Sequence, residues 1–536
     1  MTLGSTSIIF SGFGVWPIIE NEANIIDSEI KAGSAVLDFR CTNSGGLKFR
    51  CIGNAPNPKN QACNSIYCLE CKSRSKNLRQ FFRKSHYQQL NFFADTNLSF
   101  PFSKSYSEAL IHINNAEFLG SLLSDNANID NSRSGIKQLL FKLAPGSRSQ
   151  LRSDFRVYEI STPSELRHFK VLMELSIYSY LRVREIFNDL NLAKIRAVYF
   201  YNGRMAQFFS IRCALDSLGI DYICYEQGTV RPDSTFMVKN IGIHERISVS
   251  NQVLRNSGRN SDACKAVARS GLWLSERVSG TGQFSSNFVS NQISGALPEI
   301  CQSEKSYICF FTSTQWEFSE SKEVINNSVF STQKEAIKYV AKVCEIEKIP
   351  LVIRIHPNTE EGDRDFHDFC HSHSSTYVEV IKPDSPVDTY ALMENARLVI
   401  AYGSTVFIEA IYMKVPALQL AADYSYSFDV GHKLASKHDL SEAIISVSAN
   451  KKNHPVAANV DVYHQTVIKF AEAWFDFCVP WGLSLEDSSK ITTAKAWSRA
   501  APRIYRILTS FWRQPSIIKT KRFKDLKLIF TQGTPR

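Results

Sequence analysis

The sequence lacks an apolar run long enough to cross a membrane. Its longest apolar stretches, such as Leu398–Ala401 and Val415–Ala422, fall well short of the roughly 20 residues that a spanning helix needs. The first residues, Met1–Glu20, place no Lys or Arg ahead of their apolar stretch, so we expect no secretory signal. No internal repeat of fixed period is visible. These absences favour a globular protein of the cytoplasm.

Cysteine is present, but not in the setting of a disulfide scaffold. The chain has 13 cysteines among 536 residues and no expected signal, which fits a reducing compartment. Hydrophobic residues make up 44% of the chain and charged residues 21%, which is the composition of a globular protein. Because the chain is too long for one hydrophobic core, two large domains or three smaller ones are expected.

An excess of positive charge occurs only at the C-terminal end. The formal net charge is +10, and residues 488–536 contain twelve Lys or Arg and one acid, a surplus of eleven. Aromatic residues such as Trp497 and Phe511 lie between these charges. This pattern is typical of segments that bind anionic membranes or nucleic acid, and a solvated terminal helix is the plainer interpretation. We predict a basic helical tail at the inner face of the cytoplasmic membrane, with no nucleic acid as partner.

The order of the expected elements indicates an α/β fold in two halves. In the first half, a strand at Ala197–Tyr201, a helix at Arg204–Leu218 and a strand at Asp221–Tyr225 form one strand–helix–strand unit. The second half has five expected strands with helices between them, at Tyr307–Phe311, Pro350–Ile355, Val378–Ile381, Leu398–Ala401 and Ala417–Gln419. We therefore predict an N-terminal α/β domain over 1–290, with a cysteine loop at 41–71 and a helical insertion at 74–185. A second α/β domain over 300–480 and the tail over 488–536 follow.

Polar residues follow three of the strands in the second half, where open α/β sheets bind ligands. Arg354 and His356 end one strand before a proline, and an Arg with a His there can bind phosphate. A hydroxyl-lined loop of Thr312, Ser313 and Thr314 follows a second strand, the one expected at Tyr307–Phe311.

The third motif, Gly403-Ser404-Thr405, closes a strand and opens a helix whose N–H groups suit a phosphate. Glu409, one turn later, can accept hydrogen bonds from both ribose hydroxyls. Each motif alone also fits a simple turn or helix cap. Their order at the tips of one sheet predicts a nucleotide site.

The loop 41–71 carries closely spaced cysteines. Cys63, Cys68 and Cys71, with Cys51 or Cys41 upstream, provide enough thiolates for a tetrahedral zinc site. Free thiols are the other interpretation. Any zinc would be structural, and we expect no cofactor to be needed for catalysis.

Three motifs in this order resemble those of capsule-polysaccharide glycosyltransferases and of bacterial sialyl- and Kdo-transferases. They are E-Q-G at 226–228, R-I-H-P at 354–357 and G-S-T-V-F-I-E-A-I-Y-M-K-V-P at 403–416. Those enzymes share an acidic-residue–Gly motif, a His-Pro motif and a Ser/Thr motif on a GT-B fold. The segment Tyr201–Arg204 is similar to their N-terminal half. Lys414 stands where related enzymes commonly have Gly, which leaves the donor base and sugar open.

The resemblance implies two Rossmann-like domains facing a cleft and a specific division of roles. Glu226 would be the general base, with Asp233 and Glu317 as the other acids to test. His356 would stabilise the leaving phosphate, as a charge or as an acid. Ser404, Thr405 and Glu409 would hold the nucleotide. Asn202 and Arg204 would line the acceptor side.

We therefore expect an enzyme that transfers a sugar from a CMP- or UDP-linked donor to a lipid-linked or polysaccharide acceptor. The product would be capsule, O-antigen or lipopolysaccharide. A non-hydrolysing sugar-nucleotide 2-epimerase and a polyol-phosphate transferase are the alternative enzymes. A non-enzymatic protein that binds zinc and nucleic acid is the alternative from another class.

Overall fold

The computed structural model divides the chain into two compact units. Unit 1 draws on Met1–Asn97, Asn191–Tyr199 and Trp481–Arg536, and unit 2 on Leu98–Leu190 and Phe200–Pro480. The structure describes residues 5–11, 18–41, 65–93, 99, 102–123, 135–155, 160–228, 233–257, 271–277, 279, 292–303, 306–359, 364–450 and 453–492. The basic tail beyond Thr492 and most of the cysteine loop lie outside these residues. The predicted domain boundaries stay a prediction.

Unit 1 is built on a parallel sheet in which β2 pairs with β1 and with β3. Its elements are β1 (Thr6–Phe10), α1 (Ile18–Lys31), β2 (Ala35–Arg40), α2 (Ser65–Phe81), β3 (Tyr87–Asn91), the first residues of β4 (Ile195–Tyr201) and α20 (Leu485–Thr492). Gly33 ends α1 with a φ of 84°, which a residue without Cβ adopts at no steric cost. This conformation reverses the chain, so that β2 begins at Ala35, soon after the end of α1.

The first part of unit 2 consists of helices and the end of the N-terminal sheet. The helices are α3 (Phe102–Asn114), α4 (Ala116–Ser121), α5 (Ile136–Phe155), α6 (Pro163–Asn188), α7 (Ala206–Leu218) and α8 (Arg246–Asn256), and the strands are β5 (Ile223–Gln227), β6 (Ser234–Lys239) and β12 (Val479–Pro480). In order, β12, β6, β5 and the end of β4 are neighbours, and β6 is antiparallel to both β5 and β12.

One expected boundary in this part is wrong. The sequence predicts that the strand before Glu226 ends at Tyr225, but β5 continues to Gln227, and Glu226 pairs with Phe236 of β6. The added length comes from pairing with β6, a strand that the sequence did not reveal. Glu226 is therefore held by a strand pairing instead of standing in a turn.

The second sheet, in unit 2, contains five strands that are all parallel. They are β7 (Ile308–Phe311), β8 (Leu351–Arg354), β9 (Val378–Ile381), β10 (Leu398–Ala401) and β11 (Ala417–Gln419). Their spatial order is β11-β10-β7-β8-β9. Read from β9, this is the 3-2-1-4-5 order of a Rossmann sheet, with its topological switch point between β7 and β10.

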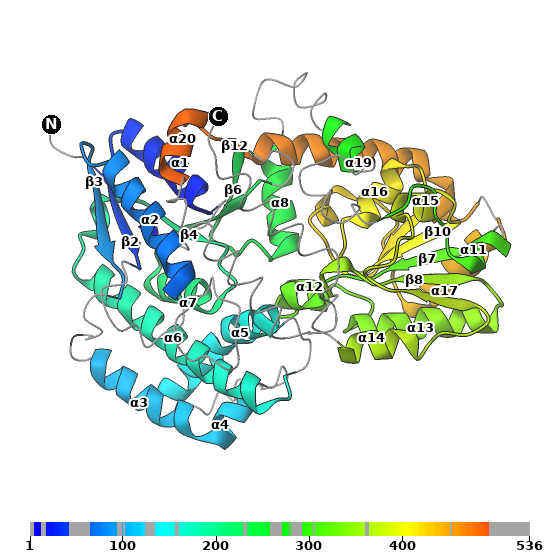
Figure 1. Ribbon diagram of the computed structural model, residues 1–536, viewed down its shortest axis with the longest axis horizontal. Helices are drawn as coiled ribbons and strands as arrows, with labels where there is room; N and C mark the ends of the chain where they lie inside the picture. The colour runs from blue at the N-terminus through cyan, green and yellow to red at the C-terminus, as the bar shows by residue number, and fades with distance from the viewer. Residues whose placement is uncertain are drawn as a thin grey trace, which may run out of the picture. The chain divides into compact units, whose positions relative to one another are not determined.

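Helices cover both faces of this sheet, which explains why β7 and β10 are continuous apolar runs. The helices of this part are α11 (Glu299–Ser303), α12 (Lys322–Asn326), α13 (Gln333–Ile346), α14 (Arg364–His371), α15 (Thr389–Glu394), α16 (Val406–Tyr412), α17 (Lys437–Ser448), α18 (Pro455–Ala458) and α19 (Val460–Phe477). Ile308 and Phe310 pack in one core with α13 and α17, while Cys309 between them contacts α15. In Figure 1, α13 lies along one face of the sheet, and α16 and α19 lie on the other.

The predicted α/β class with two Rossmann-like sheets is confirmed by these pairings. The five expected strands of the second half all occur, three of them with the expected bounds. In the part of the chain that the structure describes, no helix combines the length and apolar character needed to span a bilayer.

Candidate functional site

Asn202 and Glu226 lie side by side at the ends of β4 and β5. The Asn202 N–H donates to the Tyr225 carbonyl at 3.0 Å, and its φ of 57° turns the chain sharply at the strand end. The Asn202 side-chain Nδ2 donates to Glu226 Oε2 at 2.8 Å and to His244 Nε2 at 3.1 Å. Tyr201 Oη donates to the other Glu226 oxygen at 3.2 Å. The carboxyl group is thus held at both oxygens.

The surroundings favour the proton on Glu226 and disfavour it on His244. Burial raises the pKa of the Glu226 carboxyl, and the negative charge of Glu317 adds to this rise, while Asn202, Arg204 and Tyr201 oppose it. Burial, with the charges of Arg204 and Arg246, lowers the pKa of His244 well below its ordinary value. His244 is therefore neutral near pH 7. Because its Nε2 accepts from Asn202, its proton is on Nδ1.

The structure brings together the motifs after β7 and β8. The His356 N–H donates to Thr312 Oγ1 at 2.8 Å, and the Thr312 N–H donates to the Arg354 carbonyl at 3.1 Å. Ser313 exchanges hydrogen bonds with Gln333 at the start of α13, and Thr314 is buried beside it in the chain. Burial lowers the pKa of His356, so this side chain is also neutral near pH 7.

Arg354 has a buried guanidinium group that is only partly hydrogen-bonded. Its side chain is only 3% exposed, and Nη2 donates to the Ser385 carbonyl at 3.3 Å. Its Nε and Nη1 have no hydrogen-bond partner among the described residues. Burial lowers the pKa of Arg354 to about 10, although Asp384 opposes the shift. A buried cation with unused donors is suited to the oxygens of an anionic ligand.

The Gly403 loop lies at the end of β10, next to the end of β7. Gly403 has a φ of 66°, and its carbonyl accepts from Arg246 Nη1 at 2.7 Å. The Arg246 guanidinium stacks over the rings of Phe318, at 4.0 Å, and Tyr424, at 5.4 Å. A Cβ at Gly403 would come within 2.8 Å of Arg246 Nη1, so this contact requires glycine. Because β10 is one of the two strands beside the switch point of the sheet, Ser404 and Thr405, which follow it, lie at that point.

Glu409 is buried in α16, where three side chains bind its carboxylate. Oε1 accepts from Arg277 Nε at 2.7 Å and from Thr405 Oγ1 at 3.2 Å, and Oε2 accepts from Tyr390 Oη at 3.1 Å. Arg277 also donates to Thr405 at 3.0 Å. A ribose at this carboxylate would have to share it with Arg277.

Glu317 interacts electrostatically with both groups of motifs, the one around Glu226 and the one around His356. Its negative charge raises the pKa of Glu226 and opposes the lowering of the His356 pKa, so it lies within electrostatic reach of both. Glu317 lines a pocket with an empty volume of about 370 Å³, together with Arg204, His244 and Phe318. Asp233, the other acid considered as a base, is exposed.

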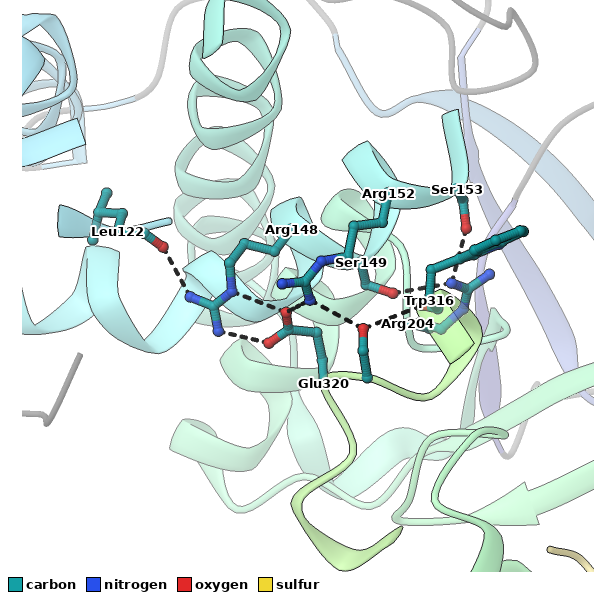
Figure 2. A network of polar contacts seen from close by, with 9 residues as sticks. Leu122, Arg148, Ser149, Arg152, Ser153, Arg204, Trp316 and Glu320 are labelled. Atoms are coloured by element: carbon teal, nitrogen blue, oxygen red, sulfur yellow. Dashed lines mark hydrogen bonds and ion pairs between the residues drawn. The ribbon is translucent and has the colours of Figure 1, made fainter. Parts of the chain in front are cut away.

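The loop that carries Glu317 is anchored to α5 by a buried ionic network, drawn in Figure 2. Glu320 accepts from Arg148 Nη2 at 2.6 Å and from Arg152 Nη1 at 2.5 Å. Arg152 also donates to Ser319 Oγ at 3.0 Å. Nearby, Arg204 Nη1 donates to Ser149 and Ser153 of α5, each at 3.0 Å (Figure 2).

Replacing Glu320 by Gln is expected to destabilise unit 2 by about 3 kcal/mol, because two buried guanidinium groups lose their shared counter-charge. Differential scanning calorimetry should record this as a clear drop in Tm. Glu442→Gln is the matched control, since Glu442 makes an exposed contact with His438 and should change Tm little. A Tm equal to that of the control variant would contradict the importance of the network.

Several residues of the site gave no signal in the sequence. His244, Arg246, Arg277, Tyr390 and Tyr424 stand outside any motif and reach the site only through the fold. Lys414 has a φ of 61°, a conformation that favours glycine, which is the residue expected there from the resemblance.

The zinc site stays a prediction. Cys51, Cys63 and the side chain of Cys68 lie outside the described residues, whereas Cys71 lies within them. Among the side chains that the structure describes, no group of three or more His, Cys, Asp or Glu is placed to hold a metal ion.

No family model matches the sequence, and no curated protein does. Solved structures with a similar arrangement include the UDP-GlcNAc 2-epimerase of Methanocaldococcus jannaschii in complex with UDP-GlcNAc and UDP. It is 14% identical, with 85% of this chain and 98% of that chain covered and a TM-score of 0.29.

Two other solved structures give similar values. The UDP-GlcNAc 2-epimerase of Neisseria meningitidis bound to UDP-GlcNAc is 11% identical, with coverages of 87% and 99% and a TM-score of 0.26. A glycosyltransferase from Rickettsia africae is 9% identical, with coverages of 92% and 100% and a TM-score of 0.28. Because all three TM-scores are below 0.5, these likenesses carry no argument for this chain.

Proposed function

We propose that the protein is a nucleotide-sugar-dependent glycosyltransferase of the GT-B type. The observation that carries the proposal is the position of Glu317, whose charge acts both on the carboxyl group of Glu226 and on the imidazole of His356. These two groups come from the strand ends of two different sheets. A transferase needs a proton acceptor on one side of the reacting carbon and stabilisation of a leaving phosphate on the other.

The second sheet supplies the donor site in this proposal. Ligands of Rossmann sheets bind at the carboxyl ends of the strands beside the switch point, which here lies between β7 and β10. Thr312, Ser313, Thr314, Ser404 and Thr405 are the residues at those ends. From the neighbouring strand β8, Arg354 provides a positive charge and unused donors for a phosphate oxygen.

The protonation states of Glu226 and His356 suit the catalytic roles that we propose for them. The raised pKa of Glu226 brings it closer to neutral pH, where a carboxylate is a more effective base for an acceptor hydroxyl. His356 is neutral, so it acts as a hydrogen-bond donor to the leaving phosphate and not as a fixed cation. Asn202 orients Glu226, and Arg204 lies on the acceptor side.

The biological setting extends the proposal beyond the site. A lipid-linked or polysaccharide acceptor, and a role in capsule, O-antigen or lipopolysaccharide assembly, rest on the motif order at 226–228, 354–357 and 403–416. The basic surplus of 488–536 supports attachment to an anionic inner-membrane surface. In the same proposal, catalysis requires no metal or cofactor.

Nucleotide binding tests the donor site. Thermal unfolding in the presence of CMP, UDP, GDP, CDP or dTDP should show a higher Tm with one base, since a ligand that binds only the folded state stabilises it. Glu409→Ala should weaken that nucleotide by about 1–3 kcal/mol in calorimetry, because it removes a carboxylate acceptor and leaves Arg277 without its partner. Glu442→Ala, an exposed carboxylate on α17, is the control and should leave the affinity unchanged.

The same measurement separates the alternatives. If no nucleotide raises Tm, or if Glu409→Ala binds as tightly as the parent, the donor site is wrong. With the preferred nucleotide sugar, NMR then distinguishes transfer from 2-epimerisation. Epimerisation at C2 without any acceptor would overturn the transferase in favour of the epimerase.

A further inference from the structure

Two residues that line one pocket each have a buried hydrogen-bond donor without a partner among the described residues. Arg204 Nε and His244 Nδ1 are shielded from solvent, and neither has a hydrogen-bond partner among the described residues. Both residues line the pocket that also contains Glu317 and Gly242. A buried donor left unpaired costs about 1–3 kcal/mol, so two in one pocket indicate a ligand that supplies acceptor atoms.

Arg204 differs from the other arginines around this pocket. Arg212 is paired with Glu245 at 2.5 Å, and Arg148 shares Glu320 with Arg152. Within the described residues, the Arg204 guanidinium donates through Nη1 to two serine hydroxyls and forms no ion pair. Its guanidinium thus holds a positive charge whose neighbours at hydrogen-bond distance are neutral.

His244 supplies a neutral donor beside this charge. Its Nε2 accepts from Asn202, which leaves the Nδ1 proton without an acceptor. The same Asn202 amide donates to Glu226 Oε2. Asn202 therefore links His244 to the carboxyl group of Glu226, which would activate the acceptor hydroxyl. A group bound at His244 is thus separated from that carboxyl group by the Asn202 side chain.

We propose that this pocket binds an anionic group of the acceptor, a carboxylate or a phosphate, so that the acceptor substrate is an acidic sugar. The inference rests on the proposed transferase and on the acceptor side being formed by Asn202 and Arg204. Arg204 provides the counter-charge and the Nε donor, and His244 donates through Nδ1–H. A neutral sugar provides no hydrogen-bonded counter-charge for Arg204.

Three monosaccharides that share one pyranose ring and differ in the group at C6 test the pocket. Glucose 6-phosphate, glucuronate and glucose are titrated at constant ionic strength, and binding is followed by NMR chemical-shift changes of the sugar. We expect one of the charged sugars, or both, to bind about ten- to a hundredfold more tightly than glucose. The tighter of the two shows whether the pocket prefers phosphate or carboxylate.

Substitutions assign the preference to this pocket. Arg204→Gln should abolish it, so that both charged sugars bind no more tightly than glucose does to the same variant. Arg204→Lys should keep part of it, because the charge remains while the Nε donor is lost. Arg255→Gln, which removes an exposed arginine of α8, is the matched control and should bind like the parent. Tm values verify that each variant is folded.

Two outcomes would overturn the inference. Equal affinity for glucose and for both charged sugars would remove the reason for an anionic acceptor. A charge preference that persists in Arg204→Gln would place the anion elsewhere. Either result, obtained with a protein that still binds its nucleotide, rejects the acidic acceptor and leaves the transferase standing. If the parent protein binds no nucleotide at all, the proposed transferase itself is rejected instead.

Discussion

Replacing Glu226 by Gln lowers kcat by about a hundred- to ten-thousand-fold if this carboxyl group is the general base. Gln preserves the size of the side chain and its hydrogen bonds with Asn202 and Tyr201 but cannot accept the proton. Nucleotide affinity should stay close to that of the parent, because the donor residues belong to the second sheet. The measurement is the initial rate of transfer with saturating donor, with nucleotide affinity from calorimetry.

Asp233→Asn is the matched control, since this acid is exposed and close to Glu226 in the chain. It should retain the parental rate. A Glu226→Gln enzyme within about threefold of the parent is too active for a missing base. The assignment would then pass to Asp233 or Glu317, whichever variant loses activity.

The pH profile gives a second test of Glu226. A base with a raised pKa loses activity as the pH falls through that pKa, so the acidic limb of kcat/KM should lie above the usual carboxyl range. Glu317→Gln removes a negative charge that raises this pKa. The limb should therefore move to lower pH, with activity persisting into more acidic solution. A limb that stays in place would show that Glu317 does not act on the base.

Replacing His356 by Ala lowers kcat by about a hundred- to a thousandfold, because one donor to the charge that develops on the leaving phosphate is removed. The hydrogen bond from the backbone of His356 to Thr312 Oγ1 is retained, so the loop should keep its conformation. The check compares kcat with nucleotide affinity, and kcat should fall much more than binding does.

His438→Ala provides the control for His356, because His438 is exposed on α17 and lies outside the site. Its rate should equal the parental rate. If His356→Ala weakens nucleotide binding as strongly as it lowers kcat, the imidazole contributes to binding the ground state and not to the transition state.

Local features of the sequence were sufficient to predict the strands of the second sheet. β7 and β10 are four-residue apolar runs, and a run of this kind fits a strand that helices cover on both faces. Polar residues directly after such runs, as at Thr312 and Ser404, were therefore predictable as residues at the strand ends. Gly219 was likewise readable as a helix end, and it adopts a φ of 65° there.

The first sheet was less predictable because its strand pairing is not local. β1 (TSIIF) and β6 (STFMVK) each begin with two polar residues, so neither is a continuous apolar run like β7 and β10. The position of Glu226 within β5, and not after it, depends on pairing with β6. No property of the residues around Glu226 alone reveals this pairing.

The sequence by itself determined which residue types stand at the strand ends of this protein, because chain order and apolar periodicity are local properties. Only the tertiary structure decided which of these residues meet. Arg246 reaches the carbonyl of Gly403, 157 residues away, and Asn202 joins Glu226 to His244. Such contacts depend on the packing of whole elements, and packing follows the total apolar surface buried and not the sequence around any single residue.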